Sequence, residues 1–140
     1  MTNRLGAGAP IFRVADVRAS LAYYVEQLGF TLDWDEGGIV SVTRDRCCVF
    51  LCEWEQGQRG TWVWIGVNDA GALHEELVAR GARVRHPPTN YAWAYEFQVE
   101  DLDGNVLRLG SDPRKGEPFG SFLDAGGTLW ATGPLRDETT

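Results

Sequence analysis

The two halves of the chain repeat each other at an offset of about 52 residues, and no other feature constrains the fold as strongly. The aligned pairs are VADV (14–17) with VNDA (67–70), Leu21 with Leu73, and Gly29 with Gly81. A single repeat of this length is one supersecondary unit whose sheet keeps an uncovered face. The two copies must therefore pair, either within one chain or across two chains.

The first half has the pattern of a strand, a helix and three more strands. The run PIFRV at 10–14 predicts the first strand, and Asp16 stands where a helix N-cap belongs. Apolar residues then recur at helical spacing, at Val17, Leu21, Tyr24, Val25 and Leu28, and Gly29 ends the helix. Further strands are predicted at about 30–34, 39–43 and 47–52.

The second half repeats this order. A strand at 61–67 leads to a helix that begins at Asn68 or Asp69 and ends at Gly81. Three more strands are predicted near 82–86, 91–99 and 105–109. The sequence thus predicts an α+β fold of two βαβββ modules, at about 9–54 and 60–112, within a single domain at 1–112.

The remaining residues, 113–140, have a different character. They are rich in Gly and Pro, show no period and end in a polar run, so we predict an extended C-terminal tail. Four apolar residues indicate that part of this tail packs on another surface: Phe119, Phe122, Leu129 and Trp130. Whether the tail caps a binding groove stays open.

Charge and cysteine content exclude several classes of function. The 140 residues carry a net charge of -7 and Lys115 is the only lysine, whereas binding to a phosphate backbone needs clustered basic residues. No apolar run approaches the ~18 residues of a membrane span, and the N-terminus lacks the pattern of a signal peptide. Cys47, Cys48 and Cys52 are too few for a disulfide framework. We expect a cytoplasmic protein that binds neither nucleic acid nor membrane and favours cationic partners.

Six tryptophans are an unusual content for a chain of this charge. Trp62 and Trp64 are two residues apart on one predicted strand, so they share a face at a spacing of roughly 6.8 Å. This spacing suits a flat ring lying against the two indoles. Trp64 could equally belong to the core, and both interpretations stay open.

The arrangement resembles the vicinal oxygen chelate superfamily, which includes glyoxalase I, extradiol dioxygenases, fosfomycin resistance enzymes and bleomycin resistance proteins. Three segments carry the resemblance: residues 10–30, the strand and helix at 61–77, and EDLDGNVLRL at 100–109. It covers about residues 9–112 and implies that the two modules form a cup-shaped mixed sheet. It also implies a homodimer with exchanged N-terminal strands, for which Pro10 resembles the hinge.

Enzymes of this superfamily hold a divalent metal ion with His, Gln or Glu side chains from the first and last strands of each module. The resemblance places these positions at Ala9, Phe50, Trp62 and Arg108. A register slip of one residue would give Leu51, Val63 or Leu107 instead. None of these side chains suits a divalent metal, and Arg108 would repel one. The two histidines, His74 and His86, are expected on a helix and in a loop, so we predict no metal, no cofactor and no catalytic residue.

The subgroup that this sequence is most similar to is the metal-free bleomycin resistance proteins. WVWI at 62–65 and WAYEF at 93–97 look like that subgroup's ligand-stacking segments, and Gly104 falls at its Gly-Asn turn. The resemblance implies a ligand-binding set of Trp34, Ile39, Phe50, Cys52, Trp62, Trp64, Trp93, Gly104 and Arg108. Five acidic residues either rim this groove or belong to an ordinary solvated surface, and both interpretations stay open: Asp33, Asp35, Glu36, Glu53 and Glu55.

The sequence therefore favours a non-catalytic protein that sequesters a flat, cationic small molecule such as bleomycin, which would give antibiotic resistance. Stacking on tryptophan and cation–π contact would supply the affinity. One alternative is a divergent metal-dependent lyase, isomerase or dioxygenase with a displaced metal site. Another is a ligand-responsive accessory protein.

Overall fold

The computed structural model describes residues 2–133, and these residues divide into two compact units. Unit 1 holds the chain up to Thr61 together with Asp101–Asn105, and unit 2 holds Trp62–Glu100 and the chain from Val106 onward. The boundary after Thr61 falls within two residues of the predicted start of the second module, at about residue 60. That residues 1–112 act as a single domain stays a prediction.

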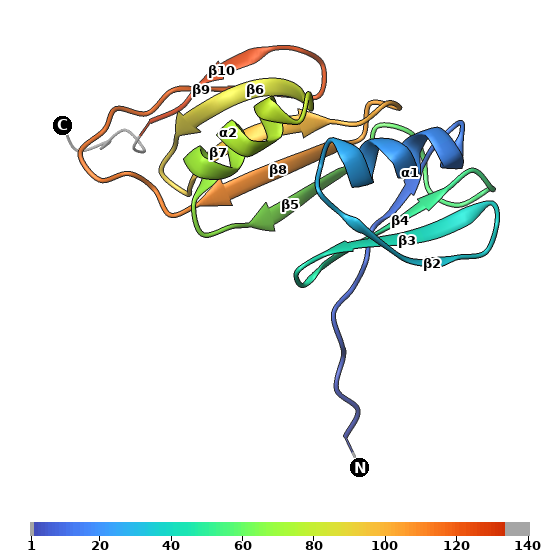
Figure 1. Ribbon diagram of the computed structural model, residues 1–140. Helices are drawn as coiled ribbons and strands as arrows, with labels where there is room; N and C mark the ends of the chain where they lie inside the picture. The colour runs from blue at the N-terminus through green and yellow to red at the C-terminus, as the bar shows by residue number, and fades with distance from the viewer. Residues whose placement is uncertain (1, 134–140) are drawn as a thin grey trace. The chain divides into compact units, whose positions relative to one another are not determined.

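Unit 1 contains a four-stranded mixed sheet and one helix (Figure 1). Its elements are β1 (Ile11–Arg13), α1 (Val17–Glu26), β2 (Thr31–Asp35), β3 (Ile39–Arg44) and β4 (Cys47–Cys52). The strand order is β1-β4-β3-β2, with β1 parallel to β4 and the other neighbours antiparallel. This is the βαβββ module that the first half of the sequence predicts.

Helix α1 covers one face of this sheet. Asp16 caps it as predicted, because its Oδ1 accepts from the backbone nitrogens of Arg18 and Ala19 at 3.0 and 3.2 Å. Gly29 takes the positive φ of 75° that ends the helical segment. Strand residues alternate between the two faces, and those of β3 and β4 beneath the helix are fully buried: Val40, Val42, Val49 and Leu51. The opposite face of the sheet has no helix of unit 1 on it.

A turn at Asp101–Asn105 packs on the start of α1 in unit 1. The buried Asp101 carboxylate accepts hydrogen bonds from the backbone nitrogens of Asp103 and Asn105, from the Asn105 amide and from the Tyr24 hydroxyl, at 2.9 to 3.0 Å. Burial raises the pKa of Asp101, and these hydrogen bonds partly oppose that rise. Gly104 has a φ of 79° in this turn, a conformation that favours glycine.

Unit 2 repeats the module and adds a hairpin. Its elements are β5 (Trp62–Gly66), α2 (Ala70–Ala79), β6 (Arg83–Asn90), β7 (Tyr95–Glu100), β8 (Val106–Ser111), β9 (Ser121–Leu123) and β10 (Leu129–Ala131). The main sheet has the order β5-β8-β7-β6, with β5 parallel to β8. Asp69, rather than Asn68, caps α2, because its Oδ1 accepts from the nitrogen of Ala72 at 3.0 Å. The buried side chains Phe97, Val99, Leu107 and Leu109 form the sheet face towards α2.

The structure differs from the sequence prediction in three places. The strand expected near 82–86 runs on to Asn90, so His86, expected in a loop, lies within β6. The strand expected at 91–99 begins only at Tyr95, because the nitrogen of Tyr91 donates to the oxygen of Ala94 at 2.9 Å and closes a turn. The tail predicted as extended contains the antiparallel pair β9 and β10, which forms a sheet of its own. Residues 134–140 of that tail lie outside the described part of the chain. Within residues 2–133, no helix is long and apolar enough to cross a membrane.

Candidate functional site

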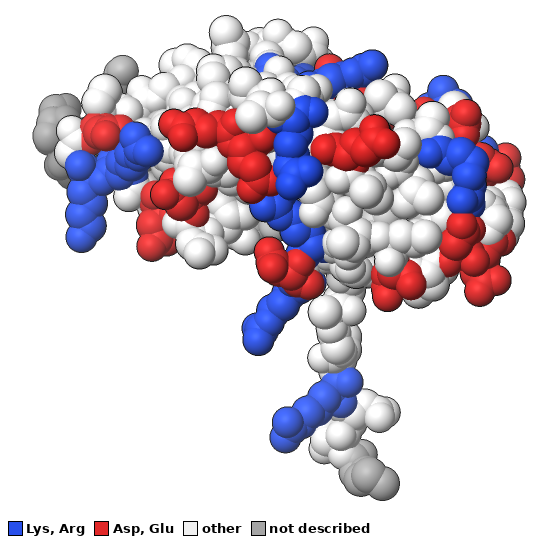
Figure 2. All heavy atoms as spheres, viewed as in Figure 1, with Lys and Arg blue, Asp and Glu red and all other residues white. Residues whose placement is uncertain are grey.

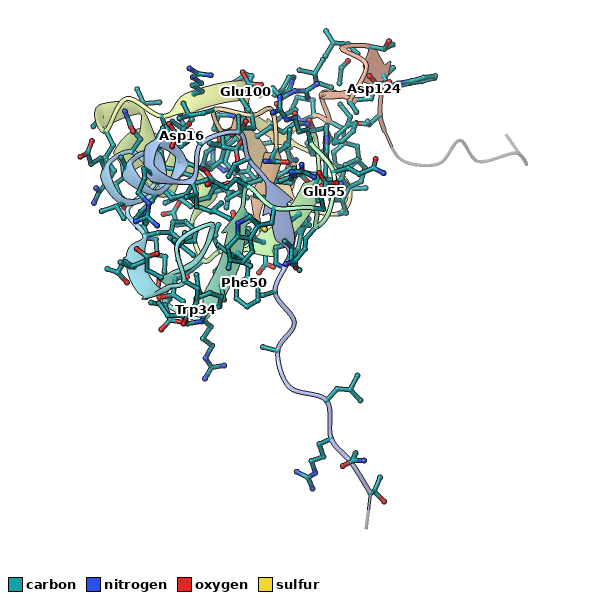
Figure 3. The ribbon with its side chains drawn as sticks, turned by 90° about the vertical axis from the view of Figure 1, so that its right-hand side faces the viewer. Asp16, Trp34, Phe50, Glu55, Glu100 and Asp124 are labelled. Carbon is teal, nitrogen blue, oxygen red and sulfur yellow. The ribbon has the colours of Figure 1, made fainter. Side chains whose placement is uncertain are left out.

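The open face of the unit 1 sheet carries a pair of aromatic rings. Ser41 of β3 lies opposite Trp34 on one side and Phe50 on the other, so the three side chains share a face. The Trp34 and Phe50 ring centroids are 5.1 Å apart at an angle of 59° (Figure 3). Trp34 keeps 36% of its surface exposed. This face therefore offers an aromatic surface that a flat molecule can reach from solvent.

A carboxylate stands beside these rings. The register between β2 and β3 shifts between Leu32 and Trp34, and this bulge lets Asp33 reach the same face. The hydroxyl of Ser41 donates to Asp33 Oδ2 at 3.2 Å, and Cys48 Sγ lies 3.2 Å from the same hydroxyl. Two aromatic faces next to an exposed carboxylate suit a flat cation, because ring quadrupole and carboxylate both attract positive charge.

Two other predicted binding residues, Ile39 and Cys52, lie on this face next to Ser41 and Phe50. Ile39 and Cys52 lie opposite each other, two residues along from Ser41 and Phe50. Ile39 is half-buried, but Cys52 is 0% exposed and its Sγ accepts from the nitrogen of Trp54 at 3.3 Å. Cys52 therefore lines no surface that solvent reaches in this structure, and its contact with a ligand stays a prediction.

Three of the five predicted rim carboxylates are already paired within unit 1. Asp35 makes two contacts of 2.7 Å with the Arg18 guanidinium, and this hydrogen bonding lowers the pKa of Asp35 to about 2. The other two are Glu53, which accepts from the nitrogen of Val17 at 2.9 Å, and Glu55, which pairs with Arg13 at 3.1 Å. Figure 2 shows basic side chains beside acidic ones on the face that it views. Of the five carboxylates, Asp35 and Glu55 are thus each paired with an arginine of unit 1.

The corresponding face of unit 2, opposite α2, is also aromatic but carries arginines. Trp64 lies opposite Arg108, and Arg108 lies opposite Gln98, so these side chains share the face, together with Trp62 two residues before Trp64. Trp64 is half-exposed, and Gly110 accommodates its ring, since a Cβ there would come within 3.0 Å of it. Trp64 therefore belongs to the open face rather than to the core.

Glu96 anchors this second face. Its carboxylate pairs with Arg108 through Nε at 2.8 Å and Nη2 at 3.0 Å, and it accepts from the indole nitrogen of Trp93. The Glu96 side chain is 1% exposed. A carboxylate buried this deeply is stable only when its partners satisfy it. The ion pair follows from the register between β7 and β8, which puts Glu96 and Arg108 on one face, whereas the Trp93 contact depends on the turn before β7.

Phe122 of β9 lies over the same face. The Arg108 guanidinium stands 4.8 Å from its ring centroid, and the rings of Trp62 and Trp93 lie 6.3 and 6.1 Å away. Tyr91 and Trp93 stack at 4.6 Å with an angle of 3° between their planes. A shallow hollow of about 330 Å³ is lined by Trp93, Arg108 and Phe122. The sequence indicated that Phe122 packs on something, but it did not indicate the surface.

A family model described as the glyoxalase/bleomycin resistance protein/dioxygenase superfamily matches residues 7–109. The chain belongs to this superfamily. No curated protein matches the chain. Among solved structures, a bleomycin-binding protein from bleomycin-producing Streptomyces verticillus, complexed with copper(II)-bleomycin, is 29% identical with a TM-score of 0.66, and the match covers 79% of this chain and 98% of that one.

Other solved structures show the same superfamily fold. TnmS3, an antibiotic-binding protein from Streptomyces sp. CB03234, has a TM-score of 0.70 at 24% identity, with 81% of this chain and 100% of that one covered. A glyoxalase/bleomycin resistance protein/dioxygenase from Nocardioides has a TM-score of 0.64 at 20% identity, covering 84% of this chain and 90% of that one. At these sequence identities, the similarity shows a shared fold and nothing further.

The metal positions of the superfamily's enzymes do not fit a metal ion in this chain. Ala9 has no ligating group, Phe50 packs against Trp34, and Arg108 is a cation paired with Glu96. Across residues 2–133, no three His, Cys, Asp or Glu side chains are grouped so that they could hold a metal. The structure therefore gives no residue set through which a metal-dependent step of the superfamily can be derived.

The two histidines have other surroundings. His74 of α2 packs edge-on against Phe97 at 5.3 Å, within the apolar layer between helix and sheet. His86 of β6 lies 3.4 Å from the hydroxyl of Thr89, and burial lowers its pKa. Neither histidine lies on a strand position that the superfamily uses for its metal.

Each unit holds part of the predicted binding set. Trp34, Ile39 and Phe50 share the open face of unit 1, whereas unit 2 holds the others on its own open face or at its edge: Trp62, Trp64, Trp93 and Arg108. Gly104 joins neither group, because it lies in the turn that packs on the start of α1. Sequence reasoning missed three residues of the unit 2 face: Tyr91, Glu96 and Arg85. Tyr91 reaches it through a turn, Glu96 through its register position in β7, and Arg85 next to a strand bulge.

Proposed function

We propose that this chain is a non-catalytic small-molecule-binding member of the superfamily, which sequesters a flat, cationic antibiotic of the bleomycin type. The observation that carries the proposal is the Trp34–Phe50 pair with the Asp33 carboxylate on the open face of unit 1. The 29% identity to a bleomycin-binding protein supports it. The poor fit of the metal positions to a metal ion supports a role in binding rather than in catalysis.

The expected energetics are those of stacking and charge. An aromatic contact adds about 0.5–1.5 kcal/mol beyond the burial of area, and a cation over an indole adds about 1 kcal/mol. Because Trp34 and Phe50 already contact each other, little side-chain freedom is lost when a ligand binds. Together with the area that the ligand buries, these contacts suffice for a dissociation constant in the micromolar range.

We further propose that the protein acts as a homodimer in a reducing cytoplasm. All three cysteines are free thiols, as a reducing compartment requires. The segment before Pro10 is exposed, and neither Gly6 nor Gly8 has an atom within 4 Å of the place where a Cβ would stand. Such a segment is free to add a strand to a second copy, as the superfamily resemblance implies.

Calorimetry and tryptophan fluorescence with metal-free bleomycin and copper(II)-bleomycin test the binding function. We expect a dissociation constant in the micromolar range, a loss of at least tenfold for Trp34→Ala, and a change of less than about threefold for the matched variant Trp34→Phe. Absence of binding up to millimolar bleomycin would reject the drug as the ligand. Equal affinities for Trp34→Ala and the wild type would reject the unit 1 face as its site.

A further inference from the structure

The β9–β10 hairpin is an addition to the superfamily fold. The family model ends at residue 109, whereas the hairpin occupies Ser121–Ala131. It does not extend the unit 2 sheet, because β9 and β10 pair only with each other. The module therefore has its full set of strands without the hairpin. The hairpin contributes instead through the surface that it covers.

Side chains and single backbone groups hold the hairpin on the open face of unit 2. Phe122 supplies the ring that meets Trp62, Trp93 and Arg108. The β10 residues Leu129 and Trp130 are each 59% exposed, so the outer strand buries little apolar surface. Hydrogen bonds add to this ring contact: the Tyr91 hydroxyl donates to the Ser121 oxygen at 3.0 Å and the Gly120 nitrogen to the Asn90 oxygen at 2.9 Å. Because no strand pairing joins the hairpin to the main sheet, it can leave and return without unfolding the sheet beneath it.

The hairpin also supplies acceptors to a cation. Arg85 donates to the backbone oxygens of Leu123 and Asp124, at 3.3 and 2.5 Å, and to the side-chain oxygen of Gln98. The Gln98 amide donates to the same Leu123 oxygen at 2.9 Å. The Arg85 guanidinium stands 5.1 Å from the Trp62 ring centroid. If the hairpin left, Arg85 and Gln98 would present unsatisfied donors beside an indole.

Arg108 on this face is compensated by a carboxylate. Arg108 is paired with Glu96, and the pair presents a flat guanidinium to the ring of Phe122. Arg85 has no carboxylate among its hydrogen-bond partners in the described chain, since its acceptors are an amide and two backbone carbonyls. A ligand that replaces Phe122 and these carbonyls must bring its own ring and its own oxygen acceptors.

We propose that the β9–β10 hairpin is a built-in, displaceable occupant of the aromatic and arginine face of unit 2, and that this face binds planar aromatic ligands carrying carboxylate or carbonyl oxygens. The hairpin acts as an internal competitor, with the ring of Phe122 in the place of the ligand ring and the oxygens of Leu123 and Asp124 in the place of its acceptors. This site lies beyond the cation-binding function proposed for the Trp34–Phe50 face, and it selects the opposite charge.

Two probes with the same ring and opposite charge test the proposal on the full-length protein. The probes are 2-naphthoate and 2-naphthylmethylammonium, titrated by calorimetry into wild type, Phe122→Ala and the control Leu129→Ala, which changes an exposed residue of the same hairpin. We expect Phe122→Ala to bind 2-naphthoate at least tenfold more tightly than wild type, whereas Leu129→Ala stays within about twofold. Equal affinity of Phe122→Ala and wild type for 2-naphthoate would overturn the proposal.

The preference for an anionic ligand is tested in the Phe122→Ala variant, which lacks the ring that covers the face. Adding Arg85→Gln to Phe122→Ala should weaken 2-naphthoate binding about tenfold and leave the ammonium probe unaffected. If Phe122→Ala bound the two probes with equal affinity, the assignment of this face to ligands with carboxylate or carbonyl oxygens would be overturned.

Displacement itself is visible without a destabilising substitution. With 4-fluorophenylalanine at position 122, the fluorine resonance should move towards its solvent-exposed position as 2-naphthoate saturates the protein. A resonance that stays fixed while 2-naphthoate is bound would reject the internal-competitor mechanism. Trp34→Ala should lose bleomycin and keep 2-naphthoate affinity, so failure of either site is seen separately.

Discussion

The carboxylate of Glu96 and the guanidinium of Arg108 form a two-point ion pair between neighbouring strands of the unit 2 sheet, on the face opposite α2. Removing the cation leaves a carboxylate that is 1% exposed without its charge partner. We expect Arg108→Met to lower the free energy of unfolding by about 3–5 kcal/mol, which urea denaturation followed by fluorescence will measure.

The double variant Glu96→Met with Arg108→Met is the matched control. It removes both charges at similar volume, so no buried ion is left unpaired, and we expect it to recover most of the stability lost by Arg108→Met. A single variant as stable as the wild type would contradict the view that this pair anchors the face.

The Asp35 carboxylate should titrate well below an ordinary aspartate. Hydrogen bonds from Arg18 and from the nitrogen of Gly37 lower its pKa to about 2, from an unperturbed value of 3.8. Because the pKa is depressed in the folded state, the stabilisation is present above pH 3.8 and is lost as pH falls through about 2. Carboxyl carbon NMR against pH measures it directly, and we expect Arg18→Gln to raise the Asp35 pKa.

The control for this titration is Arg80→Gln, which removes one cation from the surface of unit 2 and should leave Asp35 unchanged. A site-specific measurement is needed because Asp101 contributes with the opposite sign. Burial raises the pKa of Asp101, so its contribution to stability declines as pH rises above 3.8. An Asp35 pKa near 3.8 in the wild type would show that the Arg18 pair does not persist in solution.

Gly38 is required by the close approach of the Trp54 ring. A Cβ at position 38 would lie 2.0 Å from the indole nitrogen of Trp54, although the Gly38 backbone itself is not strained. We expect Gly38→Ala to lower stability by about 1–3 kcal/mol, because the indole must move off its site. In the Trp54→Ala background the same change should cost nearly nothing, and thermal denaturation of the four proteins checks this. A penalty that persists without the indole would contradict this cause.

The sequence predicted both modules because the signals that define them are local. Asp16 and Asp69 cap helices whose apolar residues recur at a regular spacing. The resemblance to the superfamily, rather than strand alternation, placed Trp34, Phe50 and Trp62 at a binding groove. The rest of the unit 2 face is built from residues outside the strands that hold these three, and their positions could not be read from a local pattern. The approach of Phe122 to Arg108 and of Trp93 to Glu96 follows from a turn and a hairpin that have no periodic pattern. The burial of Cys52 likewise depends on how neighbouring residues pack, which strand alternation does not predict.

The exposed N-terminal segment should determine the oligomeric state. Residues 2–8 are exposed and extend away from the unit 1 sheet (Figure 1), while the Pro10 oxygen accepts from the nitrogen of Phe50 at 3.0 Å, so the pairing with β4 begins there. If this segment adds a strand to a second copy, sedimentation equilibrium at micromolar concentration should give twice the 15.5 kDa mass of one chain. A variant that lacks residues 2–8 should shift to the monomer while its circular dichroism stays unchanged, because these residues make no strand within their own chain. A wild type that sediments as a monomer would count against strand exchange and would leave each aromatic face to act within a single chain.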